Sequence, residues 1–274
     1  MDGFAFPGFL QAGPPRSTVE SRLKPHLLGP ARFAVNDAGQ RTTLLHRLAA
    51  RALRYNFTMC ANYRPSTRDL LKQQFGVAPP DSDYPSEVFP GNMAPMIRLP
   101  RADAVKGDRA CAVAMFGMVP HWADTKLARH TYNARTETVA VKPSFRNAYK
   151  RRQFCIVPLS AYYEPCYESG KVVRFEIADV DGGPLGIAAI WEYKPAAEGG
   201  LPLLSFSMLT INADGHELMQ RFHKPDEEKR MPVILRPAQY DDWLHCPVVD
   251  APSFFHRYPA AGLVACAAPR TAAR

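Results

Sequence analysis

The chain has 274 residues, of which 46% are hydrophobic and 22% are charged, a composition typical of folded proteins rather than fibrous or wholly disordered ones. No stretch approaches the roughly 18 consecutive apolar residues of a membrane-spanning helix, and the first residues lack the basic and apolar regions of a secretory signal. We therefore expect a cytoplasmic protein with no membrane association.

The net charge of +8 is compatible with a nucleic acid as partner, but it is unevenly distributed. Residues 1–58 carry eight Lys and Arg against three acidic side chains, are rich in Pro, Gly and Ala, and show no sustained apolar period. We expect this segment to be an N-terminal extension, disordered or absent from the mature protein, followed by one domain over 59–270 and a tail at 271–274. The six cysteines are widely spaced, which predicts reduced thiols and neither a disulfide framework nor a metal site.

In chain order, short apolar runs bounded by Pro, Gly and Asp predict strands at 111–119, 154–159, 172–177, 185–191, 203–211 and 232–235. Helix start signals and apolar spacing predict three short helices, at 143–150, 215–222 and 237–244. Strands outnumber helices and do not alternate with them regularly. The predicted fold class is therefore α+β, a single β-rich domain with a curved, barrel-like mixed sheet and a few short helices.

The dipeptide Met59-Cys60 is chemically notable, because removal of the methionine would make the cysteine an N-terminal residue. Such a residue has an α-amine with a pKa of about 7.7–8.0 beside a thiol with a pKa of about 8.5, so both groups are partly nucleophilic near neutrality. This 1,2-aminothiol condenses with an aldehyde to an imine, and the thiol then closes a durable thiazolidine ring. From these two residues alone, an ordinary core thiol remains the alternative.

Seven separate motifs accompany this cysteine. They are MCANYR at 59–64, FGMVPHW at 116–122, NARTET at 133–138, KPSFR at 142–146, CIVP at 155–158, YYE at 162–164, and His223 with RMPVIL at 230–235. In this order they resemble the SOS response-associated peptidase family, whose members are also described as abasic-site processing proteins. The resemblance covers about residues 59–269.

The resemblance implies that Cys60 forms a thiazolidine crosslink with the ring-opened sugar aldehyde of an abasic site in single-stranded DNA, which shields the lesion in the DNA damage response. It further implies autoproteolytic removal of the residues ahead of the cysteine, and a lyase activity. We expect a monomer that needs no cofactor and, in a bacterium, lies at the nucleoid. Its partner would be single-stranded DNA that contains abasic sites.

By position, Asn133, Glu164 and His223 match the family's active-site residues. A histidine is suited to move a proton from the C1 hydroxyl to the ring oxygen of the closed sugar, which exposes the aldehyde. A half-buried carboxylate at 164 would have a raised pKa and take a proton from the amine. The amide at 133 would orient that amine or hold an oxyanion. The plain alternatives are a solvated histidine, a surface glutamate and a turn-forming asparagine.

Candidate DNA-binding residues follow from the planar guanidinium fork, which suits phosphate oxygens; they are Arg64, Arg135, Arg146 and Arg230. Trp122, with Met118 and Pro120, is expected to form an apolar tip that stacks on a base or wedges beside the lesion. The basic run at 150–152 reads more simply as a solvated face.

The sequence also departs from the family pattern. Three residues differ from the common Cys-Gly-Arg-Phe start, namely Ala61, Asn62 and Tyr63. Six residues separate His223 from Arg230, where one is usual, which leaves His216 as a competing candidate. Pro165 stands where the family has tryptophan, and 58 residues precede Met59.

Two other functions fit the same residues. A conventional cysteine peptidase would use Cys60 and His223 as a dyad on added peptides. A non-covalent reader of single-stranded DNA would bind with a strong salt dependence that is indifferent to the cysteine. Because crosslinking needs a free amine at Cys60, translation from Met59 or self-cleavage must expose it, and we favour translation from Met59.

Overall fold

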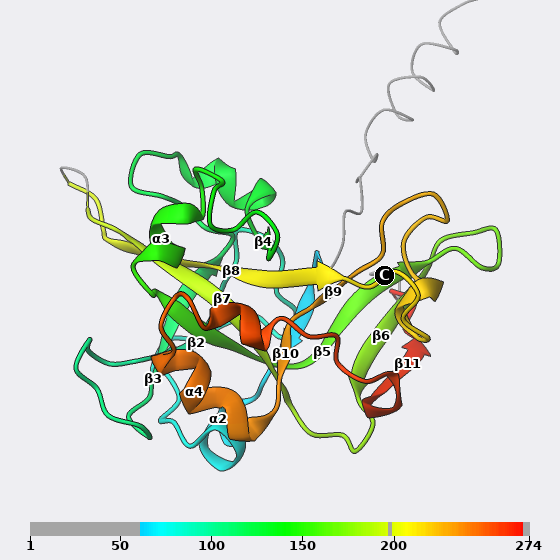
Figure 1. Ribbon diagram of the computed structural model, residues 1–274, viewed down its shortest axis with the longest axis horizontal. Coiled ribbons are helices and arrows are strands. Elements are labelled where there is room, and N and C mark those ends of the chain that lie inside the picture. Colours follow the sequence, from blue (N-terminus) through cyan, green and yellow to red (C-terminus); the bar gives the residue numbers. More distant parts are fainter. Residues whose placement is uncertain (1–60, 197–198, 271–274) are drawn as a thin grey trace, which may run out of the picture. The chain divides into compact units, whose positions relative to one another are not determined.

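In the computed structural model, which describes residues 61–196 and 199–270, the strands belong to one mixed sheet (Figure 1). They are β1 (Tyr63–Pro65), β2 (Met93–Arg98), β3 (Ala110–Phe116), β4 (Asn133–Arg135), β5 (Phe154–Cys166), β6 (Val173–Asp179), β7 (Leu185–Lys194), β8 (Leu203–Asn212), β9 (Arg230–Pro232), β10 (Ile234–Leu235) and β11 (Leu263–Ala267). Cys60, the predicted extension 1–58 and the tail 271–274 lie outside the described residues.

The helical elements are short. They are α2 (Arg68–Phe75), α3 (Arg146–Lys150), α4 (Tyr240–His245), and the 3-10 turns η1 (Thr125–His130), η2 (Met219–Arg221), η3 (Pro237–Gln239), η4 (Ala251–Phe254) and η5 (Ala260–Gly262). No helix in the described part of the chain is both long enough and apolar enough to span a bilayer.

The centre of the sheet is a closed ring of five strands. Each of β5, β7, β8, β3 and β2 pairs with the next, and β2 pairs back with β5. The β3–β8 pair is parallel and the other pairs of the ring are antiparallel. The remaining strands extend this ring: β1 and β6 pair with β5, β4 and β9 pair with β8, β10 pairs with β7, and β11 pairs with β6. The predicted α+β class with a barrel-like mixed sheet is confirmed.

Strand β5 has both of its faces buried. Phe154 and Ile156 belong to one hydrophobic cluster, whereas Cys155 and Val157 point the other way into a second cluster. Successive side chains of a strand alternate between its two faces, so a strand with two covered faces reads as one continuous apolar run. This explains why the apolar run at 154–159 predicted the start of β5 correctly.

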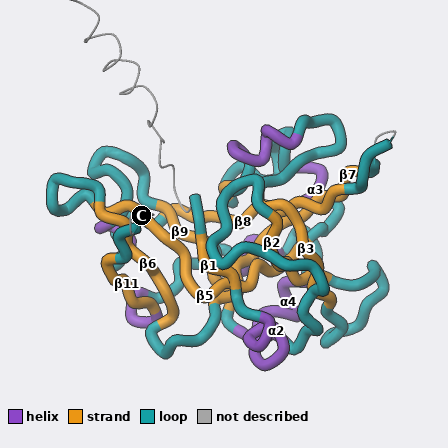
Figure 2. The backbone as a smooth tube through the Cα atoms, turned by 180° about the vertical axis from the view of Figure 1, so that it is seen from behind, coloured by secondary structure: helices purple, strands orange, loops and turns teal. Residues whose placement is uncertain are grey.

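Helices α2 and α4 lie side by side and cover one of these faces (Figures 1 and 2). Phe75 of α2 stacks on Tyr240 of α4, with ring centroids 5.3 Å apart. Trp243 is fully buried, stacks on Phe154 at 4.4 Å and donates its indole N–H to the Cys155 carbonyl at 2.9 Å. The polar edge of the largest core side chain is thereby satisfied.

The six predicted strands are present, with the run at 232–235 divided between β9 and β10, and the helices at 143–150 and 237–244 are confirmed in part as α3 and as η3 with α4. The helix predicted at 215–222 is wrong, because only η2 forms there. Gly215 has a left-handed φ of +75°, and the His216 ring accepts the N–H groups of Leu218 and Met219 in place of a helical carbonyl.

Gly117 is required where β3 leaves the ring. It has a φ of +108°, and a Cβ atom at this position would overlap the backbone of Ala128. Its N–H donates to the Phe206 carbonyl at 2.9 Å, so the backbone cannot move away freely. The approach of η1 to the sheet therefore depends on the missing side chain.

We expect Gly117→Ala to destabilise the protein by about 1–3 kcal/mol more than Gly107→Ala, since only the first adds a backbone overlap to the cost of a positive φ. Gly107 has a φ of +95° with open space around its hypothetical Cβ, which makes it a matched control. Urea denaturation of both variants measures the difference. Equal losses in the two variants would contradict this account of Gly117.

Candidate active site

Glu164 is a buried carboxylate near the end of β5. The whole residue is 1% exposed to solvent, and its side chain is fully buried. It lies opposite Phe175 of β6 in the antiparallel ladder. An ionised carboxylate is almost never buried in this way without a specific partner or a chemical task.

The start of β1 runs along the other edge of β5 at the same level. The Tyr163 N–H donates to the Asn62 carbonyl at 3.2 Å. The antiparallel register, continued by two residues beyond the Tyr63–Tyr162 pair, places Ala61 opposite Glu164. The first described residue of the chain therefore lies beside the buried carboxylate.

His223 is held against the end of β5 by its own backbone. Its N–H donates to the Pro165 carbonyl at 3.0 Å, and the preceding Phe222 forms a β-bridge with Cys166. Its φ is +63°, a left-handed conformation that costs a residue with a side chain about 1–3 kcal/mol. Such strain persists where the surroundings impose it, and it is common at active sites.

The side chains of His223 and Glu164 face each other. Nε2 of His223 lies 3.8 Å from Oε2 of Glu164 and 3.4 Å from the Arg230 carbonyl oxygen, and its side chain is 1% exposed. Because both neighbours are hydrogen-bond acceptors, this arrangement favours the imidazole form with hydrogen on Nε2. A dry histidine–carboxylate pair of this kind is suited to proton transfer.

His216, the competing candidate, is engaged elsewhere. Its Nε2 lies 2.7 Å from the Tyr258 carbonyl, and its Nδ1 accepts the N–H groups of Leu218 and Met219 at 3.3 and 3.2 Å. Both ring nitrogens are therefore used to shape the η2 turn. The structure places His223, not His216, beside Glu164.

Asn133 is the first residue of β4, a strand that pairs in parallel with β8. Asn133 lies opposite Met208, and Arg135 lies opposite Thr210. Asn133 is half-buried, whereas the Arg135 side chain is 48% exposed. Arg135 donates from Nη1 to Oε2 of Glu228 at 2.7 Å.

Arg230, expected to bind phosphate directly, is buried in this structure. Its side chain is 1% exposed and forms a two-pronged pair with Glu137, at 3.2 and 2.8 Å. It also donates to Glu228 at 2.6 Å and to the Thr210 carbonyl at 2.7 Å. While these contacts hold, its guanidinium is not available at the surface. Through Glu228 and the Arg230 carbonyl, a continuous chain of contacts joins Arg135 to His223.

Arg64 belongs to a second group of charges beside β1. It pairs with Glu176 at 2.8 Å, and Glu176 also accepts the Tyr163 hydroxyl at 3.0 Å. Arg174 lies over the Tyr163 ring, with its guanidinium carbon 3.4 Å from the ring centroid, and it pairs with Glu87.

Asn62, which replaces the family's common arginine, is buried and donates its side-chain amide to the same Glu87 carboxylate. Charged neighbours that the sequence did not reveal therefore fix the segment that leads into β1. The asparagine at this position is therefore part of the packed and hydrogen-bonded interior.

The expected apolar tip was wrong in two of its three residues. Met118 is fully buried and Pro120 is also buried, whereas Trp122 is 56% exposed. The Met118 N–H donates a hydrogen bond to the Thr131 carbonyl at 3.2 Å, which holds the Met118 backbone beside this segment. Only Trp122 is available to stack on a base.

The other arginines are divided between surface and framework. Arg146 is exposed at the start of α3, and within the described residues no hydrogen bond or ion pair joins it to the site. Arg151 binds both oxygens of Glu192 at 2.7 Å, and Arg152 donates to the carbonyls of His245 and Cys246. The basic run at 150–152 is therefore largely structural.

The cysteines of the described chain are free thiols, as the sequence predicted; they are Cys111, Cys155, Cys166, Cys246 and Cys266. Burial raises the pKa of Cys111 and of Cys246 to about 11 in each case, and it raises the pKa of Cys155 and Cys166 as well. Thiols with raised pKa values are poor nucleophiles at neutral pH.

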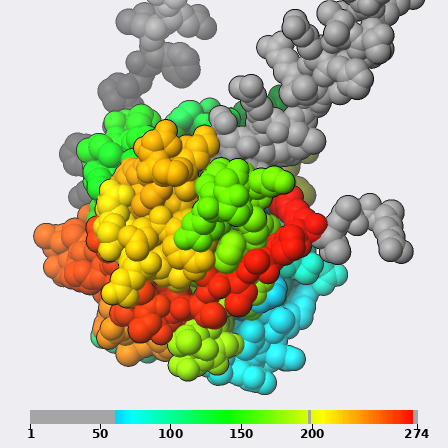
Figure 3. Space-filling view, turned by 90° about the vertical axis from the view of Figure 1, so that its right-hand side faces the viewer, coloured from blue at the N-terminus to red at the C-terminus, as the bar shows by residue number. Residues whose placement is uncertain are grey.

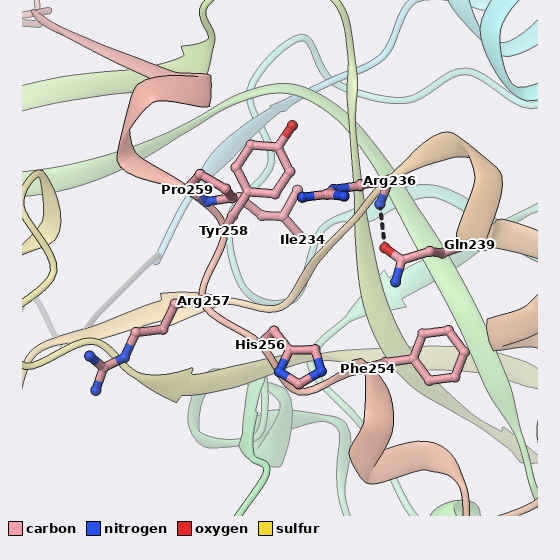
Figure 4. Close-up of a pocket in the computed structure, with 8 residues that line it drawn as sticks. All are labelled: Ile234, Arg236, Gln239, Phe254, His256, Arg257, Tyr258 and Pro259. Carbon is pink, nitrogen blue, oxygen red and sulfur yellow. Dashed lines mark hydrogen bonds between the residues drawn. The ribbon is translucent and has the colours of Figure 1, made fainter.

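A shallow pocket of about 260 Å³ lies away from these residues (Figure 4). Its lining residues are Ile234, Arg236, Gln239, Phe254, His256, Arg257, Tyr258 and Pro259. None of the candidate site residues lines it, and Arg257 is bound to the Asn212 carbonyl at 2.8 Å. Within residues 61–196 and 199–270, no three His, Cys, Asp or Glu side chains are grouped so as to hold a metal.

The sequence profile described as SOS response associated peptidase matches residues 59–267 of this chain, a span that includes the site described above. The chain belongs to this family. A crystal structure of a protein from Bordetella bronchiseptica is similar, with a TM-score of 0.70 and 37% identity over 77% of this chain and all of the other. A structure from Bacteroides thetaiotaomicron, at 21% identity and a TM-score of 0.64 over 76% of this chain and 91% of the other, shows the same fold.

Two curated relatives come from Bacillus subtilis strain 168. The abasic site processing proteins YoqW and YobE are 32% and 33% identical to this chain over 132 residues. The matched part is 47% of this chain and 55% and 56% of those proteins. The match thus spans about half the length of these relatives.

The charged cluster around Arg230 predicts a specific sensitivity to acid. Burial alone would raise the pKa of Glu137 and of Glu228, but hydrogen bonds from Arg230 and other donors, together with nearby positive charge, lower each pKa below its ordinary value of 4.5. Since the folded protein favours the ionised carboxylates, their stabilising contribution is present above about pH 4.5 and is lost as the pH falls through their lowered pKa values.

We therefore expect Glu137→Gln to be less stable than the unmodified protein at pH 7, with the difference shrinking as the pH falls below about 4.5. Urea denaturation at several pH values measures this difference. Glu217→Gln, a change at an exposed residue, is the control and should show no such pH dependence. A difference that stays constant down to pH 3 would contradict the proposed role of the ionised pair.

Proposed function

We propose that this chain recognises abasic sites in single-stranded DNA and forms a covalent thiazolidine with them through Cys60. The observations that carry the proposal are the family match over 59–267, the similarity to relatives named abasic site processing proteins, and the buried His223–Glu164 pair. Cys60 is the residue directly before Ala61 in the chain.

The reaction joins an aminothiol to an aldehyde with loss of one water. The α-amine of Cys60 attacks C1 of the ring-opened sugar, and the resulting carbinolamine loses its hydroxyl as water to give an imine. The Cys60 sulfur then bonds to the same carbon while the imine nitrogen accepts a proton. The five-membered ring that results is more durable than the imine alone.

His223 and Glu164 supply the proton transfers. His223 moves the proton of the C1 hydroxyl to the ring oxygen as the sugar opens, and in its imidazolium form it donates a proton to the departing hydroxyl of the carbinolamine. Glu164 accepts the proton that the amine must lose before it attacks. Their separation of 3.8 Å lets the carboxylate stabilise the imidazolium when the histidine holds both protons. Asn133 orients the amine or the developing oxyanion through its amide.

Four exposed side chains are the candidates to bind the strand. Arg64, Arg135 and Arg146 are exposed and suit phosphate oxygens, and Trp122 suits an unstacked base. Binding is therefore expected to weaken as the salt concentration rises.

A free α-amine at Cys60 is a chemical requirement of this mechanism. An amide nitrogen does not attack an aldehyde, so a chain that keeps Met59 has only the thiol, which gives a reversible hemithioacetal. Translation from Met59 with removal of that residue would free the amine. Self-cleavage would also free it: the Cys60 sulfur attacks the Met59 carbonyl, the amide nitrogen takes a proton and leaves, and water hydrolyses the thioester.

We expect protein that begins at Cys60 to give a denaturation-resistant adduct with a single-stranded oligonucleotide containing one abasic site, and Cys60→Ala to give no stable adduct, since the ring cannot close without sulfur. Denaturing gel electrophoresis measures the product, and intact mass establishes the first residue. A stable adduct from Cys60→Ala, or from chain that retains Met59, would overturn the thiazolidine mechanism. Cleavage of added peptides without any adduct would favour a conventional peptidase, and binding alone would favour a non-covalent reader.

We expect His223→Gln and Glu164→Gln to slow adduct formation by roughly 10²–10⁴-fold while changing the affinity for undamaged single-stranded DNA little, because proton transfer affects the rate rather than the binding. His256→Gln, at an exposed residue, is the matched control for the histidine. Single-turnover kinetics and fluorescence anisotropy separate the two effects. A loss of affinity with an unchanged rate at saturation would reassign both residues to DNA binding.

A further inference from the structure

Glu228 bridges two arginines in a way that resembles a phosphate group. One of its carboxylate oxygens lies 2.7 Å from Nη1 of Arg135, and the other lies 2.6 Å from Nη1 of Arg230. The second oxygen also accepts the Asn212 side-chain amide at 3.1 Å. Two oxygens on one centre, each bound by a different guanidinium, are also what a phosphodiester offers.

The other carboxylate of the cluster is bound differently. Glu137 pairs with Arg230 through both oxygens and also accepts backbone hydrogen bonds, and it lies two residues beyond Arg135 on the segment that follows β4. Glu228 belongs to the exposed segment of residues 224–228, and its own side chain is 34% exposed. The Glu137 side chain is also exposed, at 47%, so the two carboxylates differ in how they bind rather than in exposure. Glu228 binds Arg230 through one oxygen and Glu137 through two, so Glu228 can leave while Arg230 stays paired with Glu137.

The charges of the cluster also favour an exchange. Arg135 and Arg230 carry two positive charges, and Glu137 and Glu228 carry two negative charges, so a phosphate added to the intact cluster would make it net negative. Replacing the Glu228 carboxylate by one phosphate charge keeps the cluster neutral. In Figure 3 the segment from 213 to 229, yellow to gold, lies at the surface beside the green turn between β5 and β6, to which it is joined by the Arg221–Glu168 ion pair at 3.0 Å.

We propose that Glu228 is an internal phosphate mimic that a DNA phosphate displaces from Arg135 and Arg230 when a strand binds. The inference rests on the proposed function, because it takes single-stranded DNA as the ligand. The displaced carboxylate competes with the backbone of every strand equally and so lowers affinity without reading sequence. The exchange takes place on the side chain of Arg230, and the backbone carbonyl of Arg230 faces His223. Strand binding is thereby coupled to the candidate acid–base pair.

The lowered pKa of Glu228 keeps this competitor ionised at neutral pH, despite the burial that opposes ionisation. Glu228→Gln removes the negative charge and keeps the shape of the side chain and its ability to bond the arginines through one oxygen. Glu227→Gln is a matched control: it makes the same charge change one residue away, at a carboxylate that pairs only with exposed Lys224, at 3.3 Å.

The test is the dissociation constant of the full chain for an undamaged single-stranded oligonucleotide, measured by fluorescence anisotropy at several salt concentrations. We expect Glu228→Gln to bind about two- to fivefold more tightly, the range set by a partly exposed ion pair, and its log affinity to depend more steeply on log salt by roughly 0.7. Glu227→Gln should match the unmodified protein. In an Arg135→Ala background the gain from Glu228→Gln should disappear.

Three results would overturn the inference: no gain in Glu228→Gln, an equal gain in Glu227→Gln, or a gain that survives the loss of Arg135. Thermal melting of each variant identifies an unfolded sample before binding is measured, and in that case Glu228→Ala replaces Glu228→Gln. Adduct formation with abasic oligonucleotide is scored separately. An adduct without the affinity gain contradicts only the phosphate exchange, whereas the gain without an adduct supports the exchange and contradicts the crosslinking chemistry.

Discussion

The site depends on the double pairing of β5. This strand closes the ring through β7 and β2 along its first half, and it holds β1 and β6 along its second half. Since the backbone groups of both edges are used, the strand cannot shift its register without losing bonds to several neighbours at once. This one strand positions three residues of the site. Glu164 lies within it, Ala61 lies across the ladder from it, and the His223 N–H donates a hydrogen bond to the carbonyl of its Pro165.

Buried charge is the second constraint on the site. Burying the Arg230 guanidinium costs several kcal/mol, which close carboxylates and a backbone carbonyl offset without a large net gain in stability. What the arrangement supplies is position, because a guanidinium bonded to two carboxylates and to the Thr210 carbonyl has one orientation. Its own carbonyl then points at Nε2 of His223, and β9 is held against β8 at the same place.

Much of the fold could be predicted from the sequence because strands buried on both faces, such as β5 and β7, give continuous apolar runs. Strands β1 and β4 have only three residues each, and β2 is interrupted by Pro95, so no local pattern marks them. Asn133, Glu164 and His223 were identified from the family motifs rather than from any local physical signal. Their arrangement depends on pairings between distant segments, as does the Arg135–Glu228 contact, which joins residues 93 positions apart. Met118 and Pro120 were misjudged because composition does not tell which apolar side chains of a loop turn inward.

The segment between His223 and Arg230 is fixed at its two ends by separate bonds. The histidine backbone is bonded to Pro165, and the arginine belongs to β9, which pairs with β8. Neither backbone anchor uses the intervening residues, but the Glu228 carboxylate among them binds the Arg230 guanidinium. The longer spacing in this sequence is therefore accommodated between the two anchors, provided that Glu228 keeps its place. A stretch held in this way can differ in length and charge, and so change the surface that meets the ligand, without moving the backbone of the two anchored residues.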